Sequence, residues 1–239
     1  MATQQTLVGM GGEAALYDFG SGATFTANGR VDHTGPSLSE IRNGLSGGTS
    51  GSWKNNTNFL NSSNGFILWT VPKTGTYRIR THGCRGGANY SSEQGGYGTD
   101  MRGDFNLEGG AVLKMLVAQQ GGSSYGGGGG MTAVATNSNT PLIVSGGGNT
   151  RSPWHNTTRN ATTSTGGTSG THSWQGSNGN GGYSQAGVWG GAGFYGNPQG
   201  GESCGSTKPQ SFTNGGQGGY SCNGRGGFGG ASATDGCCY

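Results

Sequence analysis

Carboxylates and histidines are the residues with which this chain could perform acid–base chemistry, and they are sparse. Asp100 and Asp104 flank Arg102 in an alternating segment. In a regular strand, residues two apart share a face, so these three side chains would partly neutralise one another on a solvated surface. The histidines are scattered: His33, His82, His155 and His172. None has a Ser or Cys partner at the spacing of a known nucleophilic motif, so we expect no catalytic site and no enzyme.

The five cysteines could bind metal or form disulfides. Four of them lie in the C-terminal region: Cys204, Cys222, Cys237 and Cys238. Their spacing matches no zinc pattern, and two alternatives stay open, one or two late disulfides or thiols kept reduced in a cytoplasm. Cys84 stands beside Arg85, which could lower its thiol pKa. A small buried side chain at the end of a strand is the favoured interpretation.

The glycine runs invite a phosphate-binding interpretation, which the sequence argues against. Residues 126–130 are not followed by the Lys-Ser/Thr of a phosphate-binding loop, and no helical pattern follows them. The net charge is +3, from 13 basic and 10 acidic residues, and no basic run marks a nucleic-acid surface. We therefore expect no cofactor, no metal and no nucleic-acid partner.

The best candidates for recognition are aromatic residues in polar or glycine-rich surroundings: Trp154, His155, Trp174, Trp189 and Tyr195. Exposed Trp and Tyr offer a large contact area at a low entropy cost, and they stack on sugars or proteins. The alternative is that such rings cover the flanks of glycine backbone, which is favoured for Trp189 and Phe194. For Trp154 and His155 both interpretations stay open.

Short strands must position these residues. Alternating or apolar segments predict six strands, at residues 66–72, 76–81, 101–107, 111–118, 131–135 and 142–145. Within the second, Tyr77 and Ile79 face one side while two arginines face the other, so one face is buried and one is wet. Short strands with glycine-rich turns predict a sandwich or jelly roll.

Two further segments precede the first strand. Ser37 and Glu40 have the spacing of a capping box, which predicts a short helix that ends at Asn43 and Gly44. Residues 14–19 are either a short strand or an anchor segment. The opening residues 1–5 lack the basic and apolar regions of a secretory leader. For a chain that works outside a cell, this leaves release by lysis, export by another pathway or a leader already removed.

Glycine accounts for 57 of the 239 residues, whereas hydrophobic residues make up only 29%. Such a composition usually indicates disorder, and ordering glycine costs the most backbone entropy. Between residues 176 and 230, however, aromatics are interleaved with the glycines, and flexible linkers need no aromatics. Packed polyproline-II-like helices let backbones approach very closely. We therefore predict a rigid glycine scaffold in which every buried N–H and C=O is paired.

Three motifs follow one another in order: V-P-x-T-G-x-Y at residues 71–77, V-x-Q-Q-G at 117–121 and P-L-I-V-x-G-G-G at 141–148. In this order they resemble the glycine-rich extracellular domain of the anaplastic lymphoma kinase and leukocyte tyrosine kinase receptors, over residues 34–148. The resemblance implies a mostly β fold, a TNF-like β-sandwich (jelly roll) with an inserted or C-terminal polyglycine-II helix bundle and little α-helix. Because this chain has no kinase and no apolar run near the roughly 18 residues of a membrane span, cytokine binding is not carried over.

The stretch T-G-P-S-L-S at residues 34–39 and the abundance of Asn, Ser and Thr are also similar to glycine-rich proteins of marine phages and other viruses. Phage adhesins as a class use polyglycine-II bundles as platforms for host-binding loops. This resemblance implies a virion-surface structural or attachment protein, such as a tail fibre or adhesin. The alternative is a secreted or filament-forming glycine-rich protein of a eukaryote. The expected partners are further copies of the chain, with a trimer favoured, other virion proteins and a host-surface glycan or protein, without membrane insertion.

Three regions are predicted. Residues 1–33 form an N-terminal anchor or assembly segment, and residues 34–148 form the β-sandwich core with glycine-rich turns. Residues 149–239 hold a polar loop, the polyglycine-II bundle and the cysteine-containing C-terminus.

Overall fold

The computed structural model describes residues 14–48, 52–88, 95–122, 127–149, 160–167, 173–174, 176–184, 191–200, 207–220 and 224–230. These residues are 32% strand and 8% helix, and their sheets are antiparallel, so the prediction of a mostly β chain with little helix is confirmed. No helix in the described ranges is both long and apolar enough to span a membrane.

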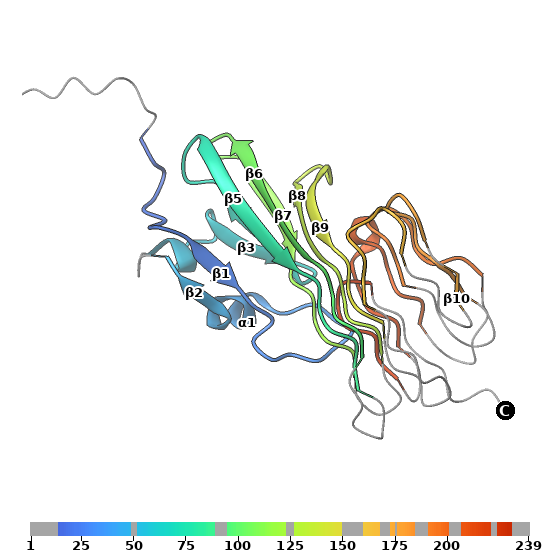
Figure 1. Cartoon of the computed structure of the whole chain (residues 1–239). Coiled ribbons are helices and arrows are strands. Elements are labelled where there is room, and N and C mark those ends of the chain that lie inside the picture. Colours follow the sequence, from blue (N-terminus) through green and yellow to red (C-terminus); the bar gives the residue numbers. More distant parts are fainter. Residues whose placement is uncertain are drawn as a thin grey trace, which may run out of the picture.

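The central element is a five-stranded sheet (Figure 1). Its strands follow the order β3 (Leu60–Ser63), β4 (Phe66–Thr70), β7 (Val112–Leu116), β8 (Thr132–Thr136) and β9 (Pro141–Ser145). Four of them were predicted, and β3 was missed. Both faces of this sheet are covered, which explains why β4 and β8 consist largely of apolar residues instead of alternating with polar ones.

A two-stranded ribbon, β5 (Gly75–His82) and β6 (Asp100–Leu107), covers one face of the central sheet. Exposure alternates along both strands with a period of two, as predicted. The inward side chains pack against the core of the central sheet: Tyr77, Ile79, Met101 and Phe105. The two layers are therefore joined by an ordinary side-chain core.

Aromatic residues from the glycine-rich half of the chain, within residues 191–230, cover the opposite face of the central sheet. Phe212 and Phe228 are fully buried, and Phe194 is 3% exposed. They pack against Phe66 and Leu116 from the sheet. Phe194 stacks on Phe212 with a distance of 4.5 Å between the ring centroids. These aromatics belong to a second hydrophobic core, so the central sheet is the middle of three layers.

The N-terminal part adds a small sheet and one helix. Strands β1 (Ala23–Phe25) and β2 (Leu45–Gly47) pair with each other, and helix α1 (Leu38–Asn43) lies between them in the sequence. The predicted capping box is confirmed, because the Ser37 hydroxyl accepts from the Glu40 N–H and the Glu40 carboxylate accepts from the Ser37 N–H. The pKa of Glu40 is lowered, chiefly by that Ser37 N–H.

Residues 14–19 do not form a strand. They lie along the sandwich instead, where the Leu16 N–H donates to the Pro72 carbonyl oxygen at 2.8 Å. The ring of Tyr17 stacks on Trp53, with the centroids 5.5 Å apart. Of the two interpretations of this segment, the strand is wrong, and the anchor role stays a prediction, as do the three sequence regions.

Four short elements complete the described chain: the 3-10 helices η1 (Ser52–Asn55) and η2 (Phe212–Asn214), and the antiparallel pair β10 (Ser173–Trp174) and β11 (Tyr183–Ser184). None of them was predicted from the sequence.

The turn between β3 and β4 shows why β3 belongs to the sheet. Asn64 and Gly65 connect the strands, and both have a positive φ, 50° and 83°. Two such residues form the tight turn that fits the twist of a hairpin, and Asn-Gly is its strongest sequence signal. Gly65 also touches Gly35, because a Cβ atom added at Gly65 would overlap the Gly35 Cα atom.

Replacing Gly65 by Ala should therefore cost more stability than replacing Gly29. Gly29 has a similar φ of 72° and nothing within 4 Å of an added Cβ, so Gly29→Ala measures the left-handed strain alone, about 1–2 kcal/mol. Gly65→Ala adds an overlap with backbone that should cost a further ~1–3 kcal/mol. Urea denaturation of both variants measures the difference. Equal losses would contradict the close contact between Gly35 and Gly65.

Candidate functional site: a glycine array between two sheet layers

Glycine-rich segments continue the strands of both layers beyond the sandwich (Figure 1). We define the glycine array by seven segments: residues 83–87, 95–99, 119–122, 127–130, 146–149, 216–219 and 225–229. The first two adjoin β5 and β6 of the ribbon, and the next three extend β7, β8 and β9 of the central sheet. The array is therefore the place where the two layers meet.

Direct hydrogen bonds between backbones join the layers in the array. The Cys84 N–H, just past β5, donates to the Gly130 carbonyl oxygen at 3.0 Å, and the Gly148 N–H, just past β9, donates to the Cys84 carbonyl oxygen at 2.9 Å. Sheets that pack through side chains lie about 10 Å apart. Here the same two layers approach to hydrogen-bonding distance.

The hydrogen bonds of the array repeat at every third residue. The N–H groups of Gly83 and Gly86 donate to the segment before β6, whereas those of Cys84 and Gly87 donate to the segment before β8. Four other pairs of segments show the same spacing. In each pair, two N–H groups three residues apart donate to two carbonyl oxygens three residues apart: Gly96 and Thr99 to Asn149 and Gly146, Gly127 and Gly130 to Gly122 and Gln119, Gln119 and Gly122 to Phe228 and Arg225, and Gly226 and Gly229 to Gly219 and Gly216. A β-ladder repeats every second residue, so this is a different form of pairing.

Side chains have no room at many of these positions. A Cβ atom added to Gly83, Gly127 or Gly147 would come closer than 3.0 Å to a backbone carbonyl group of a neighbouring segment, which real Cβ atoms essentially never do. Backbone atoms cannot rotate out of the way. None of these three glycines has a positive φ, so close approach is what requires glycine here.

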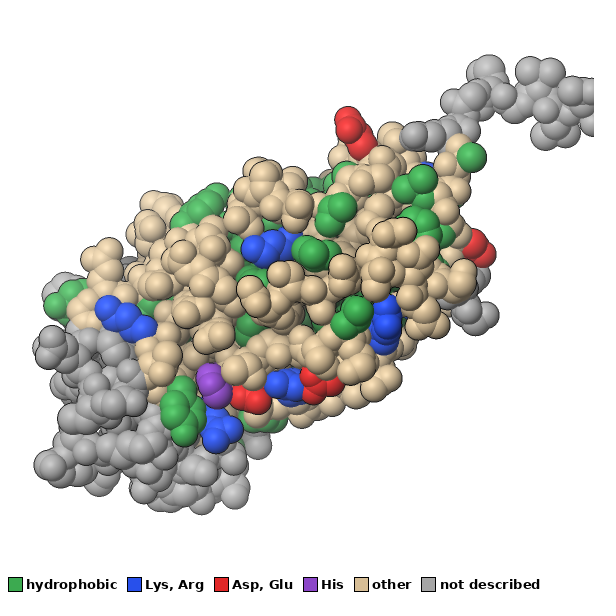
Figure 2. Space-filling model, turned by 180° about the vertical axis from the view of Figure 1, so that it is seen from behind, with side chains coloured by type: hydrophobic (Ala, Val, Ile, Leu, Met, Phe, Trp, Pro, Cys, Tyr) green, Lys and Arg blue, Asp and Glu red, His purple; other side chains and the backbone are tan. Residues whose placement is uncertain are grey.

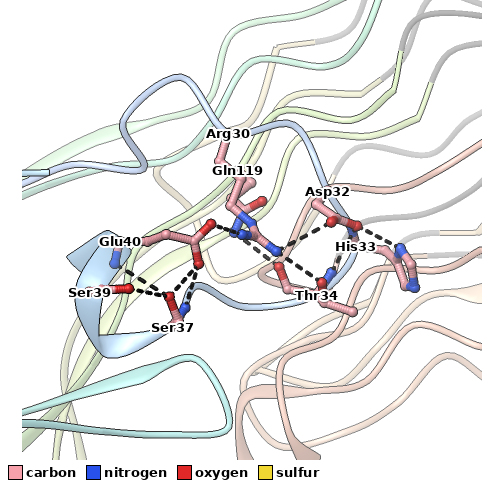
Figure 3. A network of polar contacts seen from close by, with 8 residues as sticks. All are labelled: Arg30, Asp32, His33, Thr34, Ser37, Ser39, Glu40 and Gln119. Atoms are coloured by element: carbon pink, nitrogen blue, oxygen red, sulfur yellow. Dashed lines mark hydrogen bonds and ion pairs between the residues drawn. The ribbon is translucent and has the colours of Figure 1, made fainter. Parts of the chain in front are cut away.

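A polar network holds the loop before α1, residues 30–34, against the array (Figure 3). The Asp32 carboxylate accepts from the N–H groups of His33 and Thr34, at 2.7 and 3.4 Å, and pairs with Arg30. From the array, the buried Gln119 donates its side-chain amide to the Thr34 carbonyl oxygen at 3.1 Å. The loop is thus held by its own Asp32 side chain and by the Gln119 side chain of the array.

The backbone of the same loop completes two array segments. The carbonyl oxygens of Asp32 and His33 accept from the N–H groups of Phe228 and Gly218, at 2.7 and 2.8 Å. Burial alone would raise the pKa of Asp32. The N–H groups of His33 and Thr34, together with the charges of His33 and Arg30, lower the pKa by more, and the result lies below the ordinary value.

Three of the five recognition candidates, Trp154, His155 and Trp189, lie outside the described residues. Trp174 lies in β10, opposite Tyr183 of β11. Whether the five candidates lie together is therefore not tested, and their role stays a prediction.

Tyr195 is described in full and is 51% exposed. Its N–H donates to the Gly179 carbonyl oxygen at 2.7 Å, and its ring lies where a Cβ atom of Gly179 would be, 2.7 Å from that position. The other neighbour is Phe194, whose ring meets it edge-on at 4.9 Å. Tyr195 thus covers glycine backbone while leaving half of its surface open.

Tyr97 is an exposed aromatic that sequence reasoning missed. It is the most exposed of the large hydrophobic residues in the described ranges, at 61%. The Arg85 guanidinium lies 4.4 Å from the centre of its ring, and Arg85 also donates to the Gly95 carbonyl oxygen at 2.9 Å. The available signal was an aromatic residue enclosed by glycines, at residues 95–98.

The cysteines give no metal centre or disulfide in the described chain. Cys204, Cys222, Cys237 and Cys238 lie outside the described residues, so their pairing stays a prediction. Cys84 is a free thiol whose pKa is raised by burial, in spite of a bond from the Arg85 N–H. A lowered pKa is therefore wrong for Cys84. Within the described ranges, no group of three His, Cys, Asp or Glu residues could hold a metal ion.

A scan against protein-family models finds no family that matches this chain, and a search of curated proteins finds no matching relative. The resemblance to the receptor domain therefore stays an expectation, and function is argued from the geometry of the array and its surface.

Replacing Gly147 by Ala should destabilise the protein strongly, because the added Cβ atom would overlap the Gly129 carbonyl group. We expect a loss of about 2–3 kcal/mol or more, seen as a Tm lower by roughly 5–10 °C. Gly166 is the matched control, since nothing lies within 4 Å of its added Cβ atom. Gly166→Ala should change stability by less than ~0.5 kcal/mol. Similar melting temperatures for the two variants would refute the close packing of the array.

Acid should weaken the attachment of the loop before α1. A carboxylate with a lowered folded pKa contributes stability above its unfolded pKa, near ~3.9, and loses it as the pH falls through the folded pKa. Asp32→Asn keeps an oxygen acceptor for His33 and Thr34 but cannot ionise. The difference in unfolding free energy between wild type and Asp32→Asn should therefore shrink between about pH 6 and about pH 2. A difference that does not change with pH would contradict this role.

Proposed function

We propose that this chain is a virion-surface structural and attachment protein, of the tail-fibre or adhesin kind. The observation that carries the proposal is the glycine array, in which backbone segments without side chains are hydrogen-bonded to several neighbours at once. Such an array resists bending and keeps the residues on its surface in fixed positions. A rigid presenting platform is what attachment to a surface requires.

The array is, in this proposal, a bundle of polyglycine-II helices. Its hydrogen bonds recur at the three-residue period of polyproline-II geometry. The segment at residues 127–130 bonds to four others, at residues 83–87, 119–122, 146–149 and 225–229. A strand in a sheet bonds to at most two neighbours, so bonding in four directions supports a bundle of threefold helices.

The β part is, in the same proposal, a TNF-like sandwich. Support comes from the β5–β6 ribbon, which packs over the central antiparallel sheet through a hydrophobic core. The sequence resemblance over residues 34–148 points in the same direction. A sandwich at one end and a glycine bundle at the other divide the molecule into a base and a platform (Figure 1).

Exposed tyrosines on the glycine-rich half provide surface for recognition. Tyr97, Tyr183 and Tyr195 are between 50% and 61% exposed. Tyr195 and Tyr183 lie against the backbone of Gly179 and Gly200, and Tyr97 lies against a guanidinium. A ring supported on one face has little freedom to lose, so its open face can stack on a sugar or a side chain at low entropic cost.

Several described segments stop at the same end of the array. Hydrogen bonds connect the points where described segments stop: Gly87 with Gly127, Gly127 with Gly122, Gly122 with Arg225, and Gly96 with Asn149. In the sequence, Trp154 and His155 follow Asn149 within six residues. We place the host-facing end of the protein here, whereas its location on a virion rests on the resemblance to glycine-rich viral proteins.

Binding to cell-surface preparations and glycan microarrays tests the attachment role. Labelled protein should bind a host surface, and Tyr97→Ala should weaken that binding by roughly tenfold, as loss of an aromatic contact does. Leu16→Ala is the control, because Leu16 is 52% exposed but lies against the sandwich. It should bind like the wild type. Virions that attach normally without this protein would rule out attachment.

A further inference from the structure

The outer face of the β5–β6 ribbon gathers charge in a chain that has little. Charged residues are only 10% of the sequence. On this face they follow one another along both strands: Arg78, Arg80, Asp100, Arg102 and Asp104. The side of the molecule opposite to the view of Figure 1 is mostly uncharged, with few Lys, Arg, Asp and Glu side chains among the described residues (Figure 2).

Two arginines of the ribbon are paired and one is not. Arg78 donates twice to the Asp104 carboxylate, at 2.7 and 2.8 Å, and Arg80 donates to Asp100 at 2.9 Å. These bonds lower the pKa of both carboxyl groups. Arg102 forms no hydrogen bond or ion pair with any described residue, and its cross-strand neighbour is Arg80, a like charge. Arg102 thus has no direct ion-pair partner among the described residues, although its charge helps to lower the pKa of Asp100 and Asp104 on the same face.

Among the described residues, none pairs with the outer edge of β6. On one side β6 pairs with β5, and no backbone group of Asp100–Leu107 bonds to another described segment. The edge closes just before the strand, because the Thr99 N–H donates to the Gly146 carbonyl oxygen at 2.9 Å. An eight-residue strand with an unpaired edge is a template for pairing with another chain.

We propose that this edge pairs antiparallel with the β6 edge of a second copy, about a two-fold axis at Gly103. In that register Arg102 lies opposite Asp104 of the partner subunit, and the contact occurs twice by symmetry. Asp100 lies opposite Asn106 of the partner subunit. On the inner face, the half-buried Met101 and Phe105 come opposite each other. Arg102 thereby obtains a directly opposite carboxylate, whereas the carboxylates of its own strand are paired with Arg78 and Arg80.

The charges select this register over its neighbours. An axis at Arg102 would place Arg102 opposite itself and Asp100 opposite Asp104, and an axis at Asp104 would place that carboxylate opposite itself. Like charges in directly opposite positions destabilise a strand pair. An axis at Met101 would match Asp100 with Arg102 but would need the edge of Thr99, which is already bonded to Gly146.

The edge of β5 does not offer the same match. Its outward residues are Thr76, Arg78, Arg80 and His82, and none is acidic. Two β5 edges would therefore bring basic residues together. Only β6 carries both signs of charge in an order that complements itself.

A β6–β6 contact is closed by its two-fold axis and yields a dimer. This differs from the trimer favoured by the sequence. Because the paired strands run in opposite directions and each array adjoins the start of β6, the two arrays lie at opposite ends of the dimer. A four-stranded sheet, β5–β6–β6–β5, joins them, and the particle has two platforms.

Analytical ultracentrifugation at low salt tests the contact. The wild-type chain should sediment as a dimer of 24.0 kDa subunits. Arg102→Glu turns both attractive contacts into repulsive ones and should weaken the dimer by about tenfold or more. Lys73→Glu makes the same change of charge at an exposed site before β5, outside β6, and should leave the dimer intact. A wild-type monomer or trimer, or an Arg102→Glu variant that dimerises like the wild type, would overturn the proposal.

Disulfide trapping tests the register independently of stability. Directly opposite residues of an antiparallel pair lie about 4.5–5.5 Å apart at Cα, within the range of a disulfide. A mixture of Arg102→Cys and Asp104→Cys chains should form a linked heterodimer under mild oxidation, with the bond mapped by mass spectrometry. A mixture of Arg102→Cys and Asp100→Cys chains should not. The opposite pattern would show that the axis lies at Met101 and that the proposed register is wrong.

Discussion

The arrangement of this protein depends on the absence of a Cβ atom along the segments that continue its strands. Side chains keep the β5–β6 ribbon and the central sheet at the usual spacing of about 10 Å. Beyond β5 and β9 the chain changes to glycine, and the Cys84 backbone bonds directly to Gly130 and Gly148. Backbone groups thereby replace the hydrophobic core as the contact between layers. This replacement explains how a chain with only 29% hydrophobic residues can still order a large share of its length.

Ordering so much glycine is entropically costly, and the aromatic residues offset that cost. Phe228 illustrates how the two parts are coupled. Its ring is fully buried against the central sheet, while its N–H donates to Asp32 and its carbonyl oxygen accepts from the Gln119 N–H. One residue therefore fixes the position of an array segment by packing and satisfies two of its neighbours by hydrogen bonding. The interleaving of aromatics with glycines follows from this need, because a segment made only of glycine has nothing to hold it against the sheet.

The sequence predicts the elements that have a local residue pattern. It does not predict hydrogen bonds between glycines that are distant in the sequence, because those residues are identical. Alternation placed β5 and β6, and the Ser37–Glu40 spacing placed α1. The turn at Asn64 carried a usable signal for β3 that the apolar pattern did not include. By contrast, nothing in a run of glycines encodes that Gly83 bonds to Thr99, because identical residues carry no register. The exposed Tyr97 was missed although glycines enclose it at residues 95–98, because the degree of its exposure depends on how the segments pack.

The glycine array and the β5–β6 ribbon differ in the side chains that their surfaces can present. In the glycine array the backbone fills the space that side chains would need, so few charges can be placed there. The proposed recognition on that half therefore relies on large uncharged rings such as Tyr97 and Tyr195. Charge-coded recognition requires a regular strand whose alternate residues point outward, and the β5–β6 ribbon provides one. The proposed association through the ribbon and the proposed attachment through the array therefore draw on separate residues, so one can change in sequence without disturbing the other.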